Sequence, residues 1–376
     1  MPVKLKYPWM GVVIPCLLTS FIGYSAHIFV LANFMSWKLQ LWFQSSLTML
    51  WISYALAIFT NPGRPAKSFK PLKKEWTHFC KKCQLFKPER AHHCKTCNQC
   101  VLMMDHHCPW TMNCVGFKNF PHFLRFLFWV VVTTGFLLYQ LLKRTIYLWG
   151  VKDLPSYLFE KTEITFLIIL IPMDGFVLIT VALLFIRCLS NQIIGGKTQI
   201  ESWELERLEN LYYRKKLLPQ LLVNLWEIYP NEKTPENKVL AKKLQERGRK
   251  VRFENIVTFP YDLDIWSNAL TVLGSPVQWL WLFGGPDSDG MHFKKNELAL
   301  YEEGAAIEDL LLSLPWPPDG GRNFIQQKGT NVESITENGE QVIRQRNFEN
   351  DNSYRKTWNN DWGENLEDFG VDVDVE

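Results

Sequence analysis

Four long apolar segments constrain the fold of this chain more than any other feature. They cover residues 9–31, 39–60, 123–142 and 164–189. Each approaches or exceeds the roughly 20 helical residues needed to cross about 30 Å of hydrocarbon. The first two contain no charged residue, and the fourth contains a single acid, Asp174, and a proline, Pro172. Because the apolar residues are gathered into these runs, the sequence predicts an all-α polytopic membrane protein with four transmembrane helices.

The basic residues beside these segments predict their orientation. The connection 61–122 carries eleven Lys and Arg residues, whereas the connection between the first two segments offers only Lys38. The connection 143–163 has four basic residues, but three acids lie among them. By the positive-inside rule, residues 61–122, 1–8 and 190–376 are predicted to be cytosolic and 143–163 to be a lumenal loop. The first segment is too long for a cleavable signal peptide, so it is expected to remain as an anchor.

The cytosolic connection contains an unusual concentration of cysteine and histidine. Seven of the nine cysteines lie in 35 residues, at positions 80, 83, 94, 97, 100, 108 and 114. In a reducing compartment, such a cluster is typical of metal binding and not of disulfides. The two Cys-x2-Cys steps, Cys80 to Cys83 and Cys94 to Cys97, have the spacing of zinc knuckles. The sequence therefore predicts a zinc-binding domain between the second and third helices.

A count of ligands leaves one cysteine unused. Two closed tetrahedral sites need eight ligands, which six cysteines and two histidines would supply. Spacing alone does not say which cysteine is spare, but Cys108 is the one directly preceded by an acid and two histidines, Asp105, His106 and His107. An imidazole that accepts the thiol proton raises the reactive thiolate fraction, and a carboxylate can orient that imidazole. Cys108 is thus the candidate nucleophile; the alternative is a spare structural or zinc-bound cysteine.

The run from Cys80 to Asn119, with Asp105-His106-His107-Cys108 inside it, resembles the cysteine-rich domain of the DHHC family of protein S-acyltransferases, or palmitoyltransferases. The resemblance covers about forty residues without a gap and implies a cysteine-rich domain over about 78–128. It implies Cys108 as the acyl-accepting nucleophile, His106 as general base and Asp105 as the orienter of His106. It also implies two zinc sites, the first on Cys80, Cys83, His93 and Cys100 and the second on Cys94, Cys97, His107 and Cys114.

The same resemblance implies the reaction and its setting. Members of the family transfer palmitate or a similar acyl group from acyl-CoA, through a thioester on the enzyme, to cysteines of membrane-associated or polytopic proteins. The family often has Asp-Pro-Gly and Thr-Thr-x-Glu where this chain has Asn61-Pro62-Gly63 and Thr198-Gln199-Ile200-Glu201. These departures and the long tail resemble the fungal branch of the endoplasmic reticulum, for which a cell-wall synthase is an expected substrate by analogy. No nucleic-acid partner is expected.

The phosphates of CoA require cations. Lys81, Lys82 and Arg90 are close to the motif in sequence and are predicted to contact them. The alternative is that these bases face anionic lipid at the membrane surface.

Two other classes of function fit parts of the pattern. A zinc-stabilised membrane adaptor would need the same domain without chemistry. A hydrolytic zinc enzyme is disfavoured because the ligand count closes both metal sites, which leaves no position for an activated water. Asp174, in the middle of the last span, is predicted to be a hydrogen-bonded structural group and not a substrate contact.

The region after the fourth span carries less information. Leucines and aromatics at helical spacing predict an amphipathic helix over 201–229, lying on the membrane face or on the zinc domain. The apolar patch 279–283 is too short to span a bilayer but suits its interface. Asn268 is similar to a family asparagine that caps backbone near the fourth span. From about residue 320 the chain turns polar and acidic, so residues 320–376 are predicted to be disordered.

Overall fold

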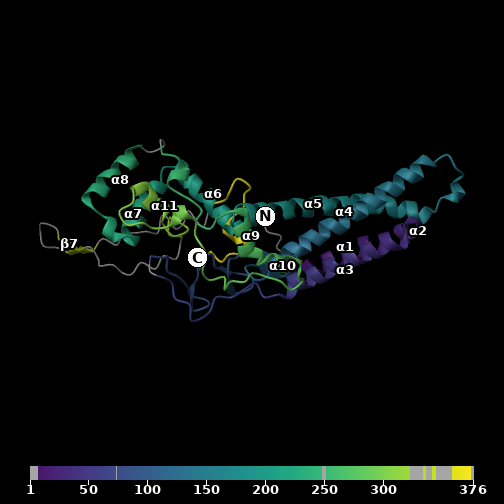
Figure 1. Cartoon of the computed structure of the whole chain (residues 1–376), viewed down its shortest axis with the longest axis horizontal. Coiled ribbons are helices and arrows are strands. Elements are labelled where there is room, and N and C mark those ends of the chain that lie inside the picture. Colours follow the sequence, from purple (N-terminus) through teal and green to yellow (C-terminus); the bar gives the residue numbers. More distant parts are fainter. Residues whose placement is uncertain are drawn as a thin grey trace.

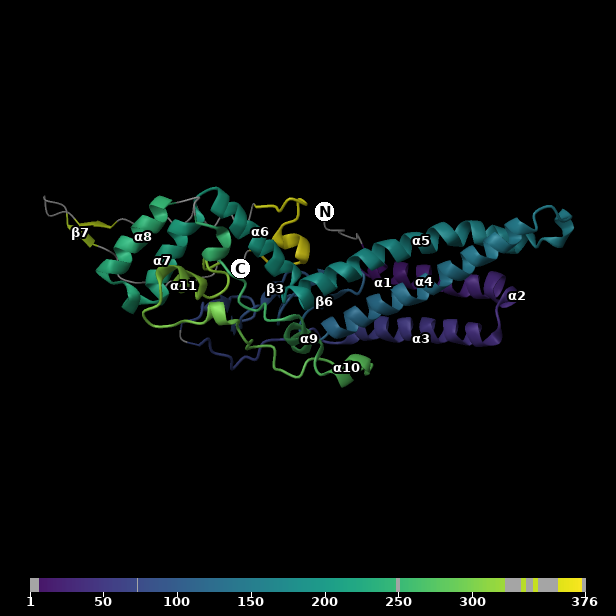
Figure 2. The ribbon, with the colours of Figure 1, turned by 45° about the horizontal axis from the view of Figure 1, so that its top comes forward.

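The computed structural model describes residues 7–72, 74–247, 251–321, 333–335, 341–343 and 358–373. Figure 1 shows an elongated molecule with long helices at one end and the cysteine-rich and C-terminal segments at the other. The second view in Figure 2 confirms that these two parts lie end to end. The functional residues therefore have to be sought where the helical part meets the rest of the chain.

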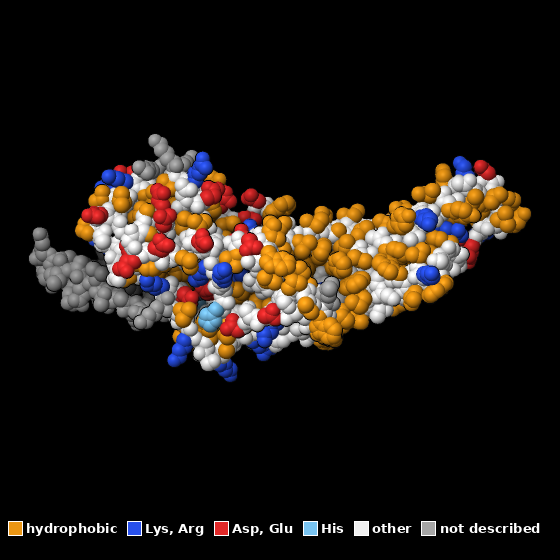
Figure 3. All heavy atoms as spheres, in the orientation of Figure 1, with side chains coloured by type: hydrophobic (Ala, Val, Ile, Leu, Met, Phe, Trp, Pro, Cys, Tyr) orange, Lys and Arg blue, Asp and Glu red, His pale blue; other side chains and the backbone are white. Residues whose placement is uncertain are grey.

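Four helices are long and apolar enough to cross a membrane. The first comprises α1 (Met10–Ala26), a π-helical turn η1 (His27–Leu31) and α2 (Ala32–Phe34), and the second is α3 (Trp37–Phe59). The third is α4 (Phe120–Gly150), and the fourth is α5 (Lys161–Leu189) with its π-helical end η3 (Ser190–Ile194). Hydrophobic side chains cover much of this part in Figure 3, as expected for a surface that faces lipid. The predicted fold of four membrane helices with an intervening cysteine-rich domain is confirmed.

The helices α4 and α5 are longer than the predicted spans. The connection predicted over 143–163 as a lumenal loop is partly helical, because α4 continues to Gly150 and α5 begins at Lys161; its lumenal position stays a prediction. Charged residues stay helical here because they pair: the guanidinium of Arg144 donates two hydrogen bonds to the carboxylate of Glu163, at 2.6 and 3.0 Å. The α4–α5 tip therefore projects beyond α2, as Figure 1 shows.

Between α3 and α4 the chain forms three small antiparallel hairpins. The first pairs β1 (His78–Cys80) with β2 (Leu85–Lys87), the second β3 (His92–Cys94) with β4 (Gln99–Val101), and the third β5 (His106–Cys108) with β6 (Asn113–Val115). Strands of three residues bury little apolar surface, so hairpins this small need another source of stability.

The C-terminal region adds a second group of helices. Its members are α6 (Gln199–Tyr213), α7 (Leu217–Ile228), α8 (Pro235–Arg247), α9 (Ile265–Leu273), α10 (Pro276–Leu280) and α11 (Ile307–Leu312). Short 3-10 turns lie between some of them: η4 (Pro230–Glu232), η6 (Phe253–Asn255) and η7 (Glu297–Ala299). A further 3-10 turn, η2 (Ser156–Leu158), lies between the membrane helices α4 and α5. The last described elements are the hairpin of β7 (Glu333–Ile335) with β8 (Gln341–Ile343) and the turn η8 (Leu366–Phe369). Helices α7, α8 and α11 share one apolar core.

The amphipathic helix predicted over 201–229 is two helices. The chain breaks between α6 and α7 because Lys215 adopts a left-handed conformation, with φ of 60°. Helix α6 lies on the cysteine-rich domain through Ile200 and Trp203, whereas α7 joins the C-terminal core. The alternative of packing on the zinc domain is therefore correct for the first half only.

The segment around α9 and α10 lies beside the ends of the membrane helices (Figure 2). The Asn268 side chain of α9 donates to the carbonyl of Ile193 at 3.3 Å, so the predicted cap near the fourth span is confirmed. Arg125 of α4 donates to the carbonyls of Gln278 and Gly284, at 2.7 and 2.8 Å. Trp281, which follows this anchored segment, is exposed. Its position at the membrane interface agrees with this exposure and stays a prediction.

The predicted disorder of residues 320–376 is wrong for residues 358–373. Most of the remainder lies outside the described residues. Residues 358–373 bury Trp358, Leu366, Phe369, Val371 and Val373 in one core with the cysteine-rich domain and α6. Five large apolar side chains within 16 residues provide the burial that the average composition of the tail conceals.

Candidate active site

The three hairpins of the cysteine-rich domain are repeats of one unit. The triplets His78-Phe79-Cys80, His92-His93-Cys94 and His106-His107-Cys108 begin 14 residues apart and each forms the first strand of a hairpin. Each hairpin turn also ends on a left-handed residue, with φ of 55° at Gln84 and 49° at both Asn98 and Met112. Equivalent positions in the three hairpins can therefore be compared directly.

The cysteines and histidines of neighbouring hairpins meet in two clusters. The ligand atoms of Cys80, Cys83, His93 and Cys100 all lie within 4.8 Å of one another, and so do those of Cys94, Cys97, His107 and Cys114. In each cluster the first hairpin supplies two thiols across its turn, and the next hairpin supplies a histidine and a thiol. These are the two sets that the family resemblance implied.

The clusters have the dimensions of tetrahedral zinc sites. The Nδ1 atom of His93 lies 3.3–3.7 Å from the three sulfur atoms of its cluster, and that of His107 lies 3.4–3.7 Å from its own three. Bonds of about 2.3 Å to sulfur and about 2.0 Å to nitrogen, at tetrahedral angles, require a separation of roughly 3.5 Å. In the turns, the N–H groups of Cys83 and Cys97 donate to the Sγ atoms of Cys80 and Cys94. The donor set and its spacing fit Zn²⁺.

In the third hairpin, Cys108 belongs to neither cluster. It stands where the first two hairpins have Cys80 and Cys94, but Thr111 replaces the second cysteine of the pair. Burial alone would raise the pKa of the Cys108 thiol; hydrogen bonding and charge from His106, with hydrogen bonds from Thr111, hold that pKa below its ordinary value. The hairpin that lacks a cysteine pair therefore presents a stabilised thiolate.

His106 is held in place by a buried carboxylate. Its Nδ1 atom lies 2.8 Å from Oδ2 of Asp105, whose Oδ1 accepts hydrogen bonds from Gln192 Nε2 at 2.8 Å and the Gln199 N–H at 2.9 Å. Burial would lower the pKa of His106, but its hydrogen bonds and charge interactions with Asp105 and Cys108 raise it overall. The arrangement of Cys108, His106 and Asp105 has the order of a nucleophile, a base and an orienting acid.

Two membrane helices fix the hairpin of Cys108 at the end of the helical bundle. The Tyr54 hydroxyl of α3 donates to the carbonyl of Trp110 at 2.6 Å. The Asn113 side chain donates to carbonyls at the end of α3 and to that of Thr60, directly after the helix, at 2.8 Å. Cys108 itself packs with Phe120, Phe123 and Leu127 of α4 in one apolar cluster. The thiol is therefore buried among apolar side chains at the end of the bundle.

The three residues predicted to contact the CoA phosphates have different surroundings in the structure. Arg90 is wrong, because its guanidinium is buried and donates two hydrogen bonds of 2.6 Å to Glu201, 111 residues away, and one to the Gly196 carbonyl. Lys82 forms an ion pair with Asp372. Lys81 is exposed, and its contact with CoA stays a prediction.

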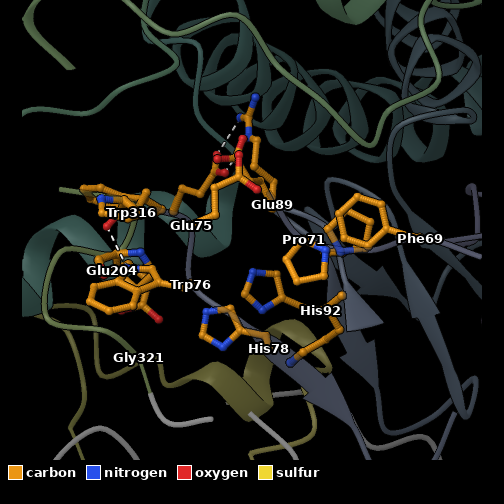
Figure 4. Close-up of a pocket in the computed structure, with 17 residues that line it drawn as sticks. Phe69, Pro71, Glu75, Trp76, His78, Glu89, His92, Glu204, Trp316 and Gly321 are labelled. Carbon is orange, nitrogen blue, oxygen red and sulfur yellow. Dashed lines mark hydrogen bonds and ion pairs between the residues drawn. The ribbon is translucent and has the colours of Figure 1, made fainter. Parts of the chain in front are cut away.

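A hollow lined in part by Arg90 and Glu201 is drawn in Figure 4. The rings of His78 and His92 lie on one side of it and those of Trp76 and Trp316 on another. The described residues that line it do not include Asp105, His106 or Cys108. Neither histidine is among the two ligand clusters, in agreement with the predicted sets.

Several residues of the site were not predicted from the sequence. Gln192 and the Gln199 N–H hold Asp105 from η3 and α6, and the Thr111 hydroxyl donates to the Cys108 carbonyl at 3.4 Å and helps to lower the pKa of its thiol. Comparison of the chain with itself at a shift of 14 residues would have revealed Thr111 as the replaced cysteine. Nothing in the local sequence marks Gln192, which becomes a neighbour of Asp105 only through folding.

Comparison with known proteins agrees with this geometry. Residues 73–206 match the family described as DHHC palmitoyltransferase. The chain is 55% identical over 377 residues to "Palmitoyltransferase PFA4" of Eremothecium gossypii and 53% identical over 379 residues to the protein of that name in Saccharomyces cerevisiae. Both alignments cover 100% of this chain and 100% of the relative. The chain therefore belongs to the DHHC palmitoyltransferase family.

Proposed function

We propose that this palmitoyltransferase carries its acyl group as a thioester on Cys108 and passes it to cysteines of membrane proteins. One observation carries the proposal. Of the seven cysteines between Cys80 and Cys114, all within the described residues, Cys108 alone lies outside both ligand clusters, and the neighbouring His106 lowers the pKa of its thiol. A thiol beside an oriented imidazole is the arrangement that nucleophilic catalysis requires.

The reaction consists of two thioester exchanges. His106 accepts the proton of Cys108, and the thiolate attacks the carbonyl carbon of acyl-CoA; the new C–S bond forms as the bond to the CoA sulfur breaks, and CoA leaves with the proton from His106. In the second exchange His106 takes the proton of a substrate cysteine, whose thiolate attacks the acyl group on Cys108. Cys108 then leaves as a thiol. Since the bonds broken and formed are alike, positioning and thiolate formation determine the rate.

We also propose that each ligand cluster holds one structural Zn²⁺. Cys80, Cys83, His93 and Cys100 would hold the first ion, and Cys94, Cys97, His107 and Cys114 the second. Four protein ligands close each site, so zinc here supplies stability and not an activated water. The metal provides the stabilisation that hairpins of three-residue strands lack.

The position of Cys108 supports transfer at a membrane surface. A chain of about fifteen methylenes at about 0.8 kcal/mol each would lose roughly 12 kcal/mol if drawn into water. The apolar cluster of Cys108 with Phe120, Phe123 and Leu127 gives the chain a path from the thiol into the bundle. The basic connection 61–122 supports a cytosolic site with both termini cytosolic and the α4–α5 tip lumenal. The endoplasmic reticulum as its location, and polytopic proteins as its substrates, rest on the resemblance to the fungal branch.

Labelling with acyl-CoA tests the proposal. Purified, zinc-replete protein given labelled palmitoyl-CoA is expected to acquire a label that hydroxylamine removes, and Cys108→Ser to acquire none. Cys188→Ser is the matched control, because Cys188 is buried in the same apolar cluster and is outside both ligand sets. Absence of label from the folded wild type, or label retained by Cys108→Ser, would instead support an adaptor without chemistry. Repetition with acyl-CoAs of graded length gives the chain-length preference.

A further inference from the structure

The end of the chain forms a strap against the zinc-ligand hairpins. This C-terminal strap, residues 358–373, lies along β3: Val371 pairs with Cys94, the Asp372 N–H donates to the His93 carbonyl at 2.8 Å, and the Lys95 N–H donates to the Gly370 carbonyl at 2.9 Å. The indole of Trp203 on α6 donates to the Glu364 carbonyl at 3.0 Å. Backbone bonds thus fix the register of the strap on a strand that carries ligands of both clusters.

Asp372 faces the first cluster from outside. Its side chain is fully buried, and its Oδ2 lies 3.9 Å from Nε2 of His93 while it pairs with Lys82. His93 directs its other nitrogen, Nδ1, at the three thiols. Metal-bound histidines commonly direct their outer N–H at a carboxylate, which fixes the ring and raises its basicity as a ligand. The side chain of Asp372 occupies that outer position.

Gly370 seats the strap on the second cluster. Its φ is +83°, and a Cβ added there would lie 2.4 Å from the Cβ of His107, a separation that no side chain tolerates. The neighbouring turn η8 packs against β5, the strand of His106, His107 and Cys108. Contact this close to His107 requires glycine for both conformation and space.

We propose that the C-terminal strap forms the outer shell of both zinc sites, with Asp372 orienting His93 and Gly370 allowing close packing against His107. The inference rests on the zinc occupancy proposed above. It makes the last residues of the chain positioning residues for the domain that holds Cys108, although they do not touch the reacting atoms. The carboxylate of Asp372 orients the His93 ring, and Gly370 allows the strap to pack closely against β5.

Zinc release tests this role directly. Full-length protein in detergent is challenged with excess chelator, and release of its two zinc ions is followed by the absorbance of a zinc-binding dye. Because loss of an outer-shell partner typically weakens metal affinity about 10–100-fold, Asp372→Asn is expected to lose one of the two ions faster by roughly that factor. Asp372→Glu keeps the carboxylate and is expected to release zinc within several-fold of the wild type.

Lys82→Met is the matched control. It removes the same ion pair on the solvent side and leaves the carboxylate beside His93. Wild-type retention of zinc in Lys82→Met together with fast release in Asp372→Asn supports the outer-shell role. Equal release from the two variants would mean that the carboxylate only anchors the strap, and wild-type retention in Asp372→Asn would mean that it does nothing for the metal; either overturns the proposal.

Gly370→Ala separates the two sites. The added methyl collides with His107, so the second ion is expected to be released faster while the first is held. The double variant Asp372→Asn, Gly370→Ala is expected to lose both ions quickly, and release of one ion only from it would overturn the two-site assignment. Acyl labelling of the same samples keeps the two proposals apart: an unlabelled wild type that retains zinc contradicts the proposed chemistry and leaves the strap standing.

Discussion

The hairpins β1–β2 and β3–β4 differ from β5–β6 in the residue that stands three positions after the shared cysteine. In the first two, a second cysteine follows the first after two residues; in the third, Thr111 follows Cys108 at that spacing. The paired thiols enter ligand clusters, whereas the pKa of the single thiol is lowered by the neighbouring His106. The comparison teaches that the residue three positions after the shared cysteine decides whether its thiol joins a ligand cluster or stays outside both.

The largest effect is expected when a ligand is removed from the metal-binding hairpins. His93→Ala deletes one of the four ligands of the first cluster, and structural zinc contributes about 10–16 kcal/mol in small zinc domains. We expect zinc content to fall from two ions to about one or fewer, with loss of acyl labelling and faster proteolysis within residues 61–122. Metal analysis of the purified variant and limited proteolysis measure both.

His92→Ala is the control for that change. His92 is the adjacent residue in the same strand but lies outside the ligand set. It is expected to keep two zinc ions and the labelling rate within a few-fold. Normal zinc content in His93→Ala would contradict the assignment of the first cluster and, with it, the contrast between the hairpins.

A large effect of a different kind is expected from Asp105→Asn in the third hairpin. The amide keeps the shape of the side chain but removes the charge that orients His106 and stabilises its protonated form. General acid–base catalysis is commonly worth about 10²–10⁴-fold, so single-turnover acylation of Cys108 is expected to slow by roughly 10³-fold. Zinc content is expected to stay at two ions per chain; loss of zinc would show that Asp105 supports the fold and not the chemistry.

The parts of this molecule that could be predicted are those determined by contiguous segments of the sequence. Four apolar runs gave the membrane helices because each buries its face in lipid without help from distant residues. The two ligand sets followed from a family resemblance carried by forty contiguous residues. By contrast, the partner of Arg90 is Glu201, and that of Lys82 is Asp372, far along the chain in both cases. Local charge patterning placed Arg90 at a CoA site because it cannot show a buried carboxylate supplied by a remote segment.

The tail was mispredicted for a related reason. Averaged over 320–376 the composition is polar and acidic, which indicates disorder. The strap holds Trp358, Leu366 and Phe369 at irregular spacing, with neither helical nor strand periodicity. Its burial depends on a surface that exists only after the hairpins and α6 have assembled, so no window of the sequence contains the signal.

The smallest effect, and the sharpest use of the comparison, is expected from Thr111→Val. Valine matches threonine in shape and keeps the backbone N–H, but it removes the hydroxyl, which donates to the Cys108 carbonyl at 3.4 Å and helps to lower the pKa of the Cys108 thiol. A hydrogen bond to a charged group contributes about 1.5–3 kcal/mol. Part of this free energy is regained when another donor takes the place of the hydroxyl. We therefore expect acylation to slow about tenfold, with two zinc ions retained. Thr111→Ser restores the hydroxyl and is expected to act near the wild-type rate. If valine and serine gave equal rates, the hydroxyl would have no part in stabilising the thiolate, and the third hairpin would depend on His106 and the turn N–H alone.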